Sequence, residues 1–308
     1  MRDNYPLVFI IGPTAVGKTE VGVELAKRMS AEIISCDSML VYKEPRVLVD
    51  KPDDKALKEI KHHMVDIVSV EEEFDVYKFK KEVDSIITQY PEKRFIFVGG
   101  SGLYAKVLLD GIFEGGGSSP QLRENLLRIA QEKGVSSLYE KLKEVDPPAS
   151  TKINPQDLKR IIRALEVYYL TNKPISLRQK EAKGYWGKFP IKIFGLYLER
   201  KLLYERINQR VEDMFRRGAV DEVRYLLRLN LSKTAEKILG IKEIKGFLEG
   251  RYTLQQAKEL LKRNTRHFAK RQYTWFKKDK RVEWIDIQGL DPQATVLRIF
   301  NRLSEIKD

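Results

Sequence analysis

Cysteine is almost absent from this chain of 308 residues, which contains one, Cys36. A single cysteine excludes an internal disulfide and a zinc site built on cysteine. Because Cys36 lies in a strand-like apolar run, we expect a small core residue. Histidine offers no better metal site, since the side chains of the adjacent His62 and His63 point in different directions.

Long hydrophobic runs are also missing. No apolar stretch approaches the roughly 20 residues that a membrane-spanning helix needs. The start of the chain, Met1 to Pro6, lacks the apolar segment of a signal peptide. We therefore expect a cytoplasmic protein with no membrane partner, and we expect it to act as a monomer.

Acidic residues are fewer than basic ones: the chain has 44 Asp and Glu residues and 57 Lys and Arg residues, which gives a net charge of +13. Such an excess favours a polyanionic partner, since neutralised phosphates release counterions. A surface rich in Lys and Glu, typical of heat-adapted proteins, is the alternative. Composition leaves both interpretations open, and the positions of the basic residues must decide.

A phosphate-binding pattern stands near the start of the chain. The apolar run Leu7 to Ile11 predicts a buried strand, and a helical pattern follows from Glu20 to Met29. Between them lies a Walker A loop, whose glycines allow backbone N–H groups to converge on a phosphate. Lys18 would add a point charge and Thr19 a hydroxyl ligand for Mg²⁺. The loop comprises Gly12, Pro13, Thr14, Ala15, Val16, Gly17, Lys18 and Thr19.

A carboxylate follows the second predicted strand. The run from Glu32 leads directly into Asp37 and Ser38, so both residues should face the phosphate loop across the strand ends. From the residues alone, Asp37 could bind Mg²⁺, act as a general base, or cap the next turn.

The third predicted strand lacks an acid at its end. Phe95 to Val98 runs into Gly99, Gly100 and Ser101, where many P-loop ATPases carry a metal-binding carboxylate. This absence weakens a motor-ATPase interpretation. It favours kinase-like or transferase chemistry on a bound phosphate compound.

Strand and helix patterns alternate over the first hundred residues, which predicts an α/β fold with a P-loop NTPase-like parallel sheet flanked by helices. At Gly115–Pro120 a Gly/Ser/Pro run breaks the pattern, and the following residues to about Ala182 are helical. We therefore predict a core domain of residues 1–114 and 188–308 with an inserted all-helical domain at 115–187. Further strands are expected at 191–198 and 282–285, and a last helix from Pro292.

Basic residues concentrate on two predicted helices. Lys159, Arg160 and Arg163 lie within about one turn of the insertion. Near the C-terminus, cations alternate with aromatic residues, a pattern that suits an RNA backbone with stacked bases, although we expect the aromatic rings to belong to the core. That second set contains Lys262, Arg263, Arg266, Lys270, Arg271, Tyr273, Trp275 and Phe276. A third basic pair, Arg206 and Arg210, follows the strand at 191–198; it could reach the phosphate loop or form a helix-surface salt bridge.

Together these motifs resemble one family, the tRNA dimethylallyltransferases (isopentenyltransferases). The resemblance runs nearly end to end. Its motifs are Gly12–Thr19, Asp37-Ser-Met, His62-His63 with Asp66-Ile67, Val98–Tyr104, Asp146-Pro, Arg163–Val167, Arg206-Ile with Gln209-Arg-Val, Gly240 with Lys242-Glu243, and Ala269–Phe276.

The resemblance implies a reaction and roles for particular residues. The family transfers a dimethylallyl group from dimethylallyl diphosphate to the exocyclic amine of the adenosine 3′ of the anticodon. It implies that Lys18 and Arg210 bind the diphosphate, that Thr19 binds Mg²⁺ as cofactor, and that Asp37 is the general base. Ser101 stands where the family usually has Thr. The implied tRNA contacts are Asp37, Ser38, Met39, Leu40, Ser101, Arg123, Lys159, Arg160, Ile161, Ile162, Arg163, Arg271 and Gln272.

The chain departs from the family pattern in a few places. Leu40 replaces a Gln, and Ile241 replaces a Tyr. Before Lys-Pro, the family usually has a glycine-containing segment, whereas residues 44–50 here read Glu-Pro-Arg-Val-Leu-Val-Asp. These changes affect the expected contacts with tRNA. The C-terminal zinc finger of eukaryotic members is absent, as in bacterial-type members.

Two other hypotheses remain. A small-molecule or nucleoside kinase would use the same loop on ATP, but it would leave the basic helices unexplained. A P-loop module that binds RNA without catalysis would use Asp37 only as a cap. The ordered set of motifs favours the dimethylallyltransferase, with the tRNA anticodon stem-loop and dimethylallyl diphosphate as partners; binding of ATP to the same loop stays open.

Overall fold

The computed structural model describes residues 6–113 and 117–304. Most of the start of the chain, which we expect to lack a signal peptide, and part of the predicted break at 115–120 therefore lie outside the described residues. The chain divides into two compact units. The first joins the residues up to Val107 to those from Trp186 onward, and the second is Leu108–Tyr185. No helix of the described part of the chain is long and apolar enough to cross a membrane.

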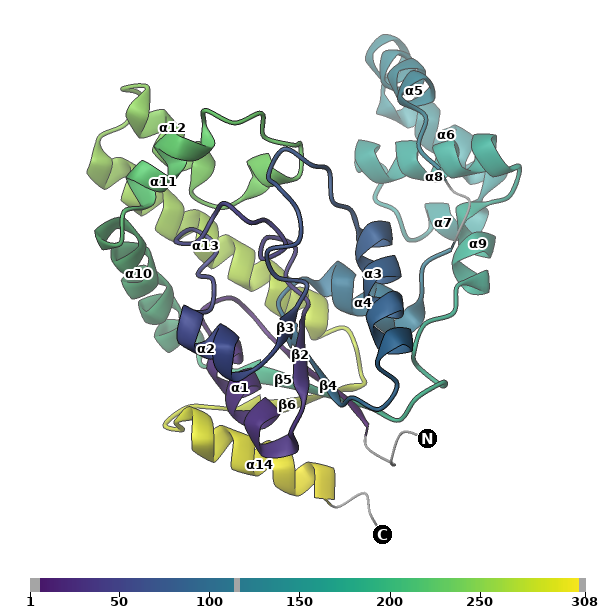
Figure 1. Ribbon diagram of the computed structural model, residues 1–308. Helices are drawn as coiled ribbons and strands as arrows, with labels where there is room; N and C mark the ends of the chain where they lie inside the picture. The colour runs from purple at the N-terminus through teal and green to yellow at the C-terminus, as the bar shows by residue number, and fades with distance from the viewer. Residues whose placement is uncertain (1–5, 114–116, 305–308) are drawn as a thin grey trace. The chain divides into compact units, whose positions relative to one another are not determined.

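A parallel sheet of six strands forms the centre of the first unit, in the order β3-β2-β4-β1-β5-β6 (Figure 1). The predicted α/β class is confirmed, and all five predicted strands are present. The sixth, β3, is only two residues long and pairs with β2 through His62 and His63. The strands are β1 Leu7–Ile11, β2 Glu32–Ser35, β3 His62–His63, β4 Phe95–Gly99, β5 Ile191–Tyr197 and β6 Val282–Asp286.

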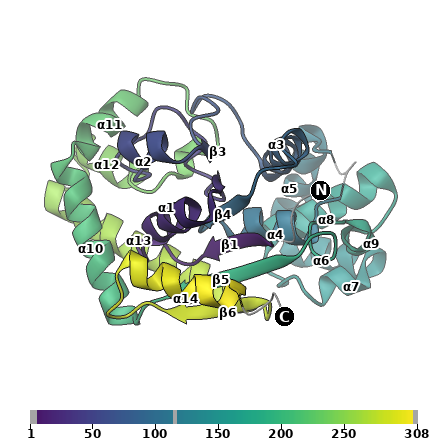
Figure 2. The same ribbon diagram turned by 60° about the horizontal axis from the view of Figure 1, so that its bottom comes forward.

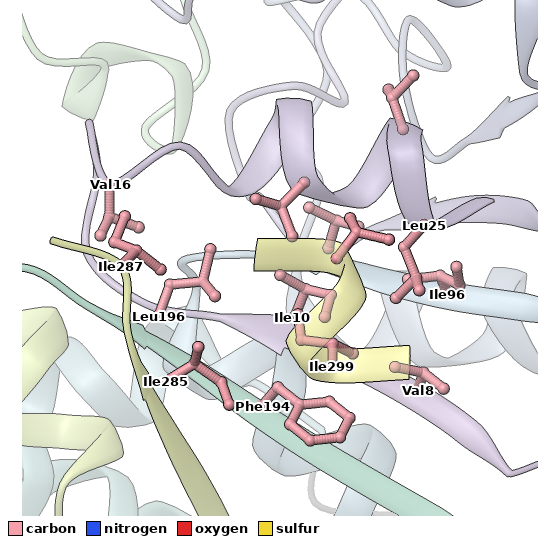
Figure 3. Close-up of a cluster of buried hydrophobic side chains, with 14 of the residues drawn as sticks. Val8, Ile10, Val16, Leu25, Ile96, Phe194, Leu196, Ile285, Ile287 and Ile299 are labelled. Atoms are coloured by element: carbon pink, nitrogen blue, oxygen red, sulfur yellow. The ribbon is translucent and has the colours of Figure 1, made fainter. Parts of the chain in front are cut away.

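Two helices cover one face of this sheet. Side chains alternate across strands, so Ile10 of β1 and Phe194 of β5 point toward α1 (Lys18–Met29) and α14 (Pro292–Ser304), which contact each other. Figure 3 shows this cluster, with Leu25 of α1 and Ile299 of α14 beside strand residues. Its buried aliphatic side chains hold β1 and α1 in a fixed relation, and the phosphate loop connects them.

Aromatic stacking marks the opposite face of the sheet. Phe9 and Phe97, on neighbouring strands, stack with ring centroids 4.4 Å apart. Phe79 and Tyr104 stack in the same way at 3.9 Å. Figure 2 shows the remaining helices around the sheet. The elements of the first unit not yet named are α2 Asp54–Glu59, α3 Val76–Gln89, α4 Gly102–Asp110, α10 Arg200–Arg216, α11 Ala219–Leu226, the 3-10 helix Ala235–Lys237, α12 Ile241–Leu248 and α13 Leu254–Phe276.

The second unit is all helical within its described residues and has its own core of buried residues from α5, α6 and α8. This compact unit spans Leu108–Tyr185, so its boundary falls within α4, whereas the Gly/Ser/Pro run led us to expect the insertion at 115–187. The two ends of the unit are joined by the Tyr185 N–H, which donates to the Leu108 carbonyl at 2.7 Å. Its further helices are α5 Pro120–Lys133, α6 Val135–Val145, α7 Pro147–Ser150, α8 Leu158–Thr171 and α9 Ile175–Glu181.

Candidate active site at the phosphate-binding loop

The loop between β1 and α1 forms a strained, open cradle. Gly12, Ala15 and Gly17 have φ of +149°, +62° and +93°, and a Cβ on Gly12 would lie 2.9 Å from the Leu196 carbonyl oxygen. Gly17 caps α1 without any side-chain hydrogen bond, so the first turn of the helix keeps its N–H groups for an anion. Thr19 is exposed in this first turn.

Lys18 is a cation without an anionic hydrogen-bond partner among the residues that the structure describes. Its ammonium donates to the Pro13 carbonyl at 2.7 Å. Burial lowers the pKa of Lys18 to about 8; the charge of Asp37 opposes this shift, and that of Arg210 adds to it. The loop therefore presents a cation whose charge a bound anion would stabilise.

Arg210 reaches the loop from α10, in a part of the chain distant in sequence. Its Nη1 donates to Thr14 Oγ1 at 3.0 Å, and its buried Nε has no hydrogen-bond partner in the described part of the chain. A buried guanidinium N–H without an acceptor is costly, which points to a ligand at this position. Of the two possibilities for Arg210, the structure favours the phosphate loop over a salt bridge on its own helix.

Asp37 uses one carboxylate oxygen as a cap. Its Oδ1 accepts the Met39 N–H at 2.9 Å, whereas its Oδ2 forms no hydrogen bond within the described chain. Ser101 supports this turn: its Oγ accepts the Ser38 N–H at 3.0 Å and lies 3.2 Å from the Ser38 hydroxyl. Capping and proton acceptance are therefore compatible roles, since each needs a different oxygen.

One pocket brings these groups together. Lys18, Thr19, Asp37 and Arg210 all line it, next to an apolar wall. That wall consists of Ile33, Leu40, Val49, Val65 and Val98. A pocket lined by cations, carboxylates and aliphatic side chains suits a molecule with a phosphate head and a short hydrocarbon tail.

Gln272, predicted to contact tRNA, braces the pocket from α13. Its Oε1 accepts the Thr14 N–H at 2.9 Å and its Nε2 donates to the Gly100 carbonyl at 2.9 Å. The side chain is buried, so its hydrogen-bonding groups tie the phosphate loop to the end of β4.

Sequence reasoning assigned no role in the site to three polar residues that also line this pocket, Ser35, Asp50 and His62, although His62 belongs to one of the motifs of the family resemblance. His62 bonds to the Ile60 carbonyl through Nδ1 at 2.7 Å, and burial lowers the pKa of His62. Asp50 pairs with Arg210 and with Arg217. The only signal for Asp50 was the departure of residues 44–50 from the family pattern.

Charged residues of the second unit gather around a buried carboxylate on α8. Glu166 accepts from Arg123 Nε at 2.7 Å, from Arg163 Nη1 at 2.6 Å and from the Ser119 N–H at 3.0 Å. Burial opposes the charge of Glu166, but these hydrogen bonds outweigh it and lower the pKa. Both arginines remain partly exposed beside it.

The expected contact of Ile161 and Ile162 with tRNA stays a prediction, and their buried side chains leave only the backbone for it. Both side chains are buried in the core of the second unit, because they lie on the face of α8 that packs against its neighbouring helices. Lys159 and Arg160, directly before them in the chain, are exposed. These two isoleucines fix the helix that carries the basic residues.

A second pocket, of about 600 Å³, lies between α10 and α13. Its cations are Arg200, Lys270, Lys277 and Lys278, and none of them forms an ion pair within the described residues. Tyr197, Tyr204 and Tyr273 also line it. Phe276 is buried as expected, but Trp275 is 41% exposed, so the aromatic residues of α13 do not all belong to the core.

Comparison with known proteins gives one consistent result. The model of the IPP transferase family matches residues 40–279. The tRNA dimethylallyltransferases of Halothermothrix orenii and Natranaerobius thermophilus are 42% and 44% identical to this chain, over 94% and 97% of it and over 90% and 91% of their own lengths.

Solved structures agree. The full-length tRNA isopentenylpyrophosphate transferase of Bacillus halodurans is 35% identical and superposes with a TM-score of 0.72, covering 98% of this chain and 96% of that one. A eukaryotic dimethylallyltransferase acting on tRNA is 27% identical and has a TM-score of 0.82, with 99% and 81% covered. This chain therefore belongs to the IPP transferase family.

Proposed function

We infer that this protein is a tRNA dimethylallyltransferase, which moves a dimethylallyl group from dimethylallyl diphosphate to the exocyclic N6 amine of the adenosine 3′ of the anticodon and releases pyrophosphate. The observation that carries this inference is the shared pocket of Asp37, Lys18 and Arg210. It sets a proton acceptor beside a diphosphate cradle. The reaction class expected from the sequence is confirmed by family membership.

The chemistry follows from the charges in the pocket. The amine nitrogen attacks the allylic carbon, the carbon–oxygen bond to the diphosphate breaks, and the electron pair leaves with pyrophosphate. Lys18, Arg210 and the N–H groups of the loop stabilise the charge that develops on the leaving group. The nitrogen then loses a proton, which the free Oδ2 of Asp37 accepts.

Mg²⁺ fits this site as a partner of the substrate. No group of three or more His, Cys, Asp or Glu side chains within the described residues could hold a metal ion. Mg²⁺ tolerates few protein ligands when phosphate oxygens and water supply the rest, and the Thr19 hydroxyl lines the pocket. When bound, the ion would neutralise negative charge on the diphosphate.

We propose that exposed basic residues of both units contact the tRNA. In the second unit these are Arg123, Lys159, Arg160 and Arg163, and on α13 Arg271 and the cations of the α10–α13 pocket. Such residues neutralise phosphates, and the target base must leave the stack of the anticodon loop to enter the pocket. Because the substrate is a tRNA, we propose that the enzyme acts in the cytoplasm.

The test uses Mg²⁺, labelled dimethylallyl diphosphate and an anticodon stem-loop with adenosine 3′ of the anticodon. Asp37→Asn keeps an oxygen that can accept the Met39 N–H but removes the base. We expect wild type to transfer label to RNA and the variant to lose about two to four orders of magnitude in rate. Asp75→Asn, which retains the cap of α3, is the matched control and should stay fully active.

Two results would contradict this function. Phosphate release from ATP without transfer of label to RNA would support the kinase alternative. Full activity of Asp37→Asn would remove Asp37 as the base and restrict it to capping.

A further inference from the structure

A second carboxylate, that of Asp50, lies at the diphosphate end of the pocket between two arginines. Its Oδ1 is 3.0 Å from Arg217 Nη1, and its Oδ2 is 3.6 Å from Arg210 Nη1. Asp50 also lines a neighbouring pocket together with Thr19. The proposed diphosphate ligand Arg210 therefore already has an anionic partner inside the protein.

The segment that carries Asp50 is fastened on both sides. Before it, Glu222 of α11 accepts the N–H groups of residues 46 to 48 at 2.7, 2.7 and 2.8 Å. After it, the buried ammonium of Lys51 donates to the carbonyls of Tyr42 and Lys43 and pairs with Asp66. Asp50 itself has a φ of +50°, which Asp tolerates. Its carboxylate is thus held at the pocket by the fold.

Asp50 and a diphosphate compete for the same cation. Arg210 offers its Nη groups and a buried Nε without a partner, and a phosphate group could accept from two of them at once. With the diphosphate on Arg210, the Asp50 carboxylate would face anionic oxygens across a short distance. Like charges at such distances repel strongly in a partly buried site.

We propose that Asp50 is an internal counter-ion of Arg210, which the diphosphate displaces on binding and which reclaims Arg210 when pyrophosphate leaves. Asp50 is a positioning residue in this scheme, because it acts through Arg210 and touches no reacting atom. It weakens binding of the donor and promotes release of the product. The inference rests on the proposed function, since it takes Lys18 and Arg210 as the diphosphate ligands.

The first test measures binding of inorganic pyrophosphate by calorimetry, with EDTA present, at low salt. Asp50→Asn removes the charge but keeps a residue that tolerates positive φ. We expect it to bind pyrophosphate about tenfold more tightly than wild type, and the gain to shrink at about 0.5 M salt. The matched control is Asp53→Asn, which removes the same charge three residues away, retains the cap of α2 and should bind as wild type does.

The kinetics of Asp50→Asn should change in two quantities, the KM for the prenyl donor and the inhibition by pyrophosphate. The KM for the prenyl donor falls and pyrophosphate becomes a stronger product inhibitor, effects that a loss of stability would not produce. Unchanged or weaker binding of pyrophosphate in EDTA would overturn the proposal. If Asp50→Asn bound pyrophosphate more weakly than wild type only in Mg²⁺ buffer, the result would overturn the proposal and indicate that Asp50 is a metal ligand. Failure of the wild-type protein to bind pyrophosphate at all would refute the proposed function itself.

Discussion

Lys18 shows how a single residue prepares the site for an anion. Within residues 6–113 and 117–304, its ammonium has only the Pro13 carbonyl as hydrogen-bond acceptor, and burial is the main reason that its pKa falls to about 8. In the unfolded chain, Lys18 stays protonated up to about pH 10.5, because its pKa there has the ordinary value for lysine. Between these values the unfolded state binds more protons, so this group makes the ligand-free protein more stable as pH rises.

Binding of pyrophosphate should depend on pH with the opposite sign. A bound diphosphate needs the charged ammonium, so above about pH 8 binding must take up a proton. We expect the affinity to fall by roughly tenfold per pH unit above that value. Titration calorimetry from pH 7 to 10 measures this slope. In Lys18→Arg, whose side chain stays charged throughout, the slope should vanish, and an unchanged slope there would assign it to another group.

The sequence predicts site residues well where chemistry lies next to a pattern. Asp37 comes two residues after the apolar strand β2, and Lys18 and Thr19 end the loop that follows the apolar strand β1. Parallel strands bring such positions to one edge of the sheet. No local sequence pattern places Asp50 or Gln272 at the site. Asp50 lies at the site because Glu222 and Lys51 fasten its loop, and the bridging contacts of Gln272 join residues more than 170 positions apart. Pairings over such distances leave no periodic signal in the chain.

At the scale of elements, the loop before Lys51 depends on one helix. The Glu222 carboxylate on α11 accepts three backbone N–H groups of this loop, more than any side chain near it in sequence could provide. Two acceptor oxygens with several lone pairs make this possible. The fold thus fixes the position of Asp50 from outside the sheet.

Glu222→Gln should loosen this loop. An amide retains one acceptor oxygen and introduces donors that face the loop N–H groups, so at least one N–H loses its partner. We expect the free energy of unfolding to fall by about 1–3 kcal/mol and the amides of Val47 and Leu48 to exchange faster. Thermal unfolding and hydrogen exchange measure both effects. Asp221→Asn on the same helix changes an exposed residue paired with Arg224 and should alter neither. Equal exchange in the two variants would contradict the anchoring role.

The elements themselves were predictable to different degrees. Apolar runs rich in β-branched residues predict buried strands, and the sequence contains such a run at β1, β2, β4, β5 and β6. The edge strand β3 has two histidines and no apolar run, and its pairing with Ile33 and Ile34 forms only in the folded sheet. The predicted insertion 115–187 follows a Gly/Ser/Pro run in the sequence, whereas the compact unit Leu108–Tyr185 follows contacts in the folded chain, among them the Tyr185–Leu108 hydrogen bond.

At the scale of the molecule, the excess of positive charge is unevenly neutralised. Some basic residues are paired: Lys258 and Lys262 both bond to Glu212 and lower the pKa of that carboxyl to about 2. The cations of the α10–α13 pocket, in contrast, have no acidic partner among the described residues. A surface adapted to heat would pair its charges in networks, whereas an RNA-binding surface leaves them available.

The two explanations of the net charge predict different salt dependences for tRNA binding. If the α10–α13 pocket faces phosphates, Lys277→Gln and Lys278→Gln each weaken binding and reduce the slope of log K against log salt by about 0.7 to 0.9, because each removes one released counterion. Lys27→Gln removes the same charge from α1, where Lys27 pairs with Glu24 and Glu59, and should leave the slope unchanged. The affinity for an anticodon stem-loop, measured between 50 and 200 mM salt, distinguishes the two explanations. Equal small effects in all three variants would mean that the charge serves the surface in general, because a diffuse field does not distinguish paired from unpaired lysines.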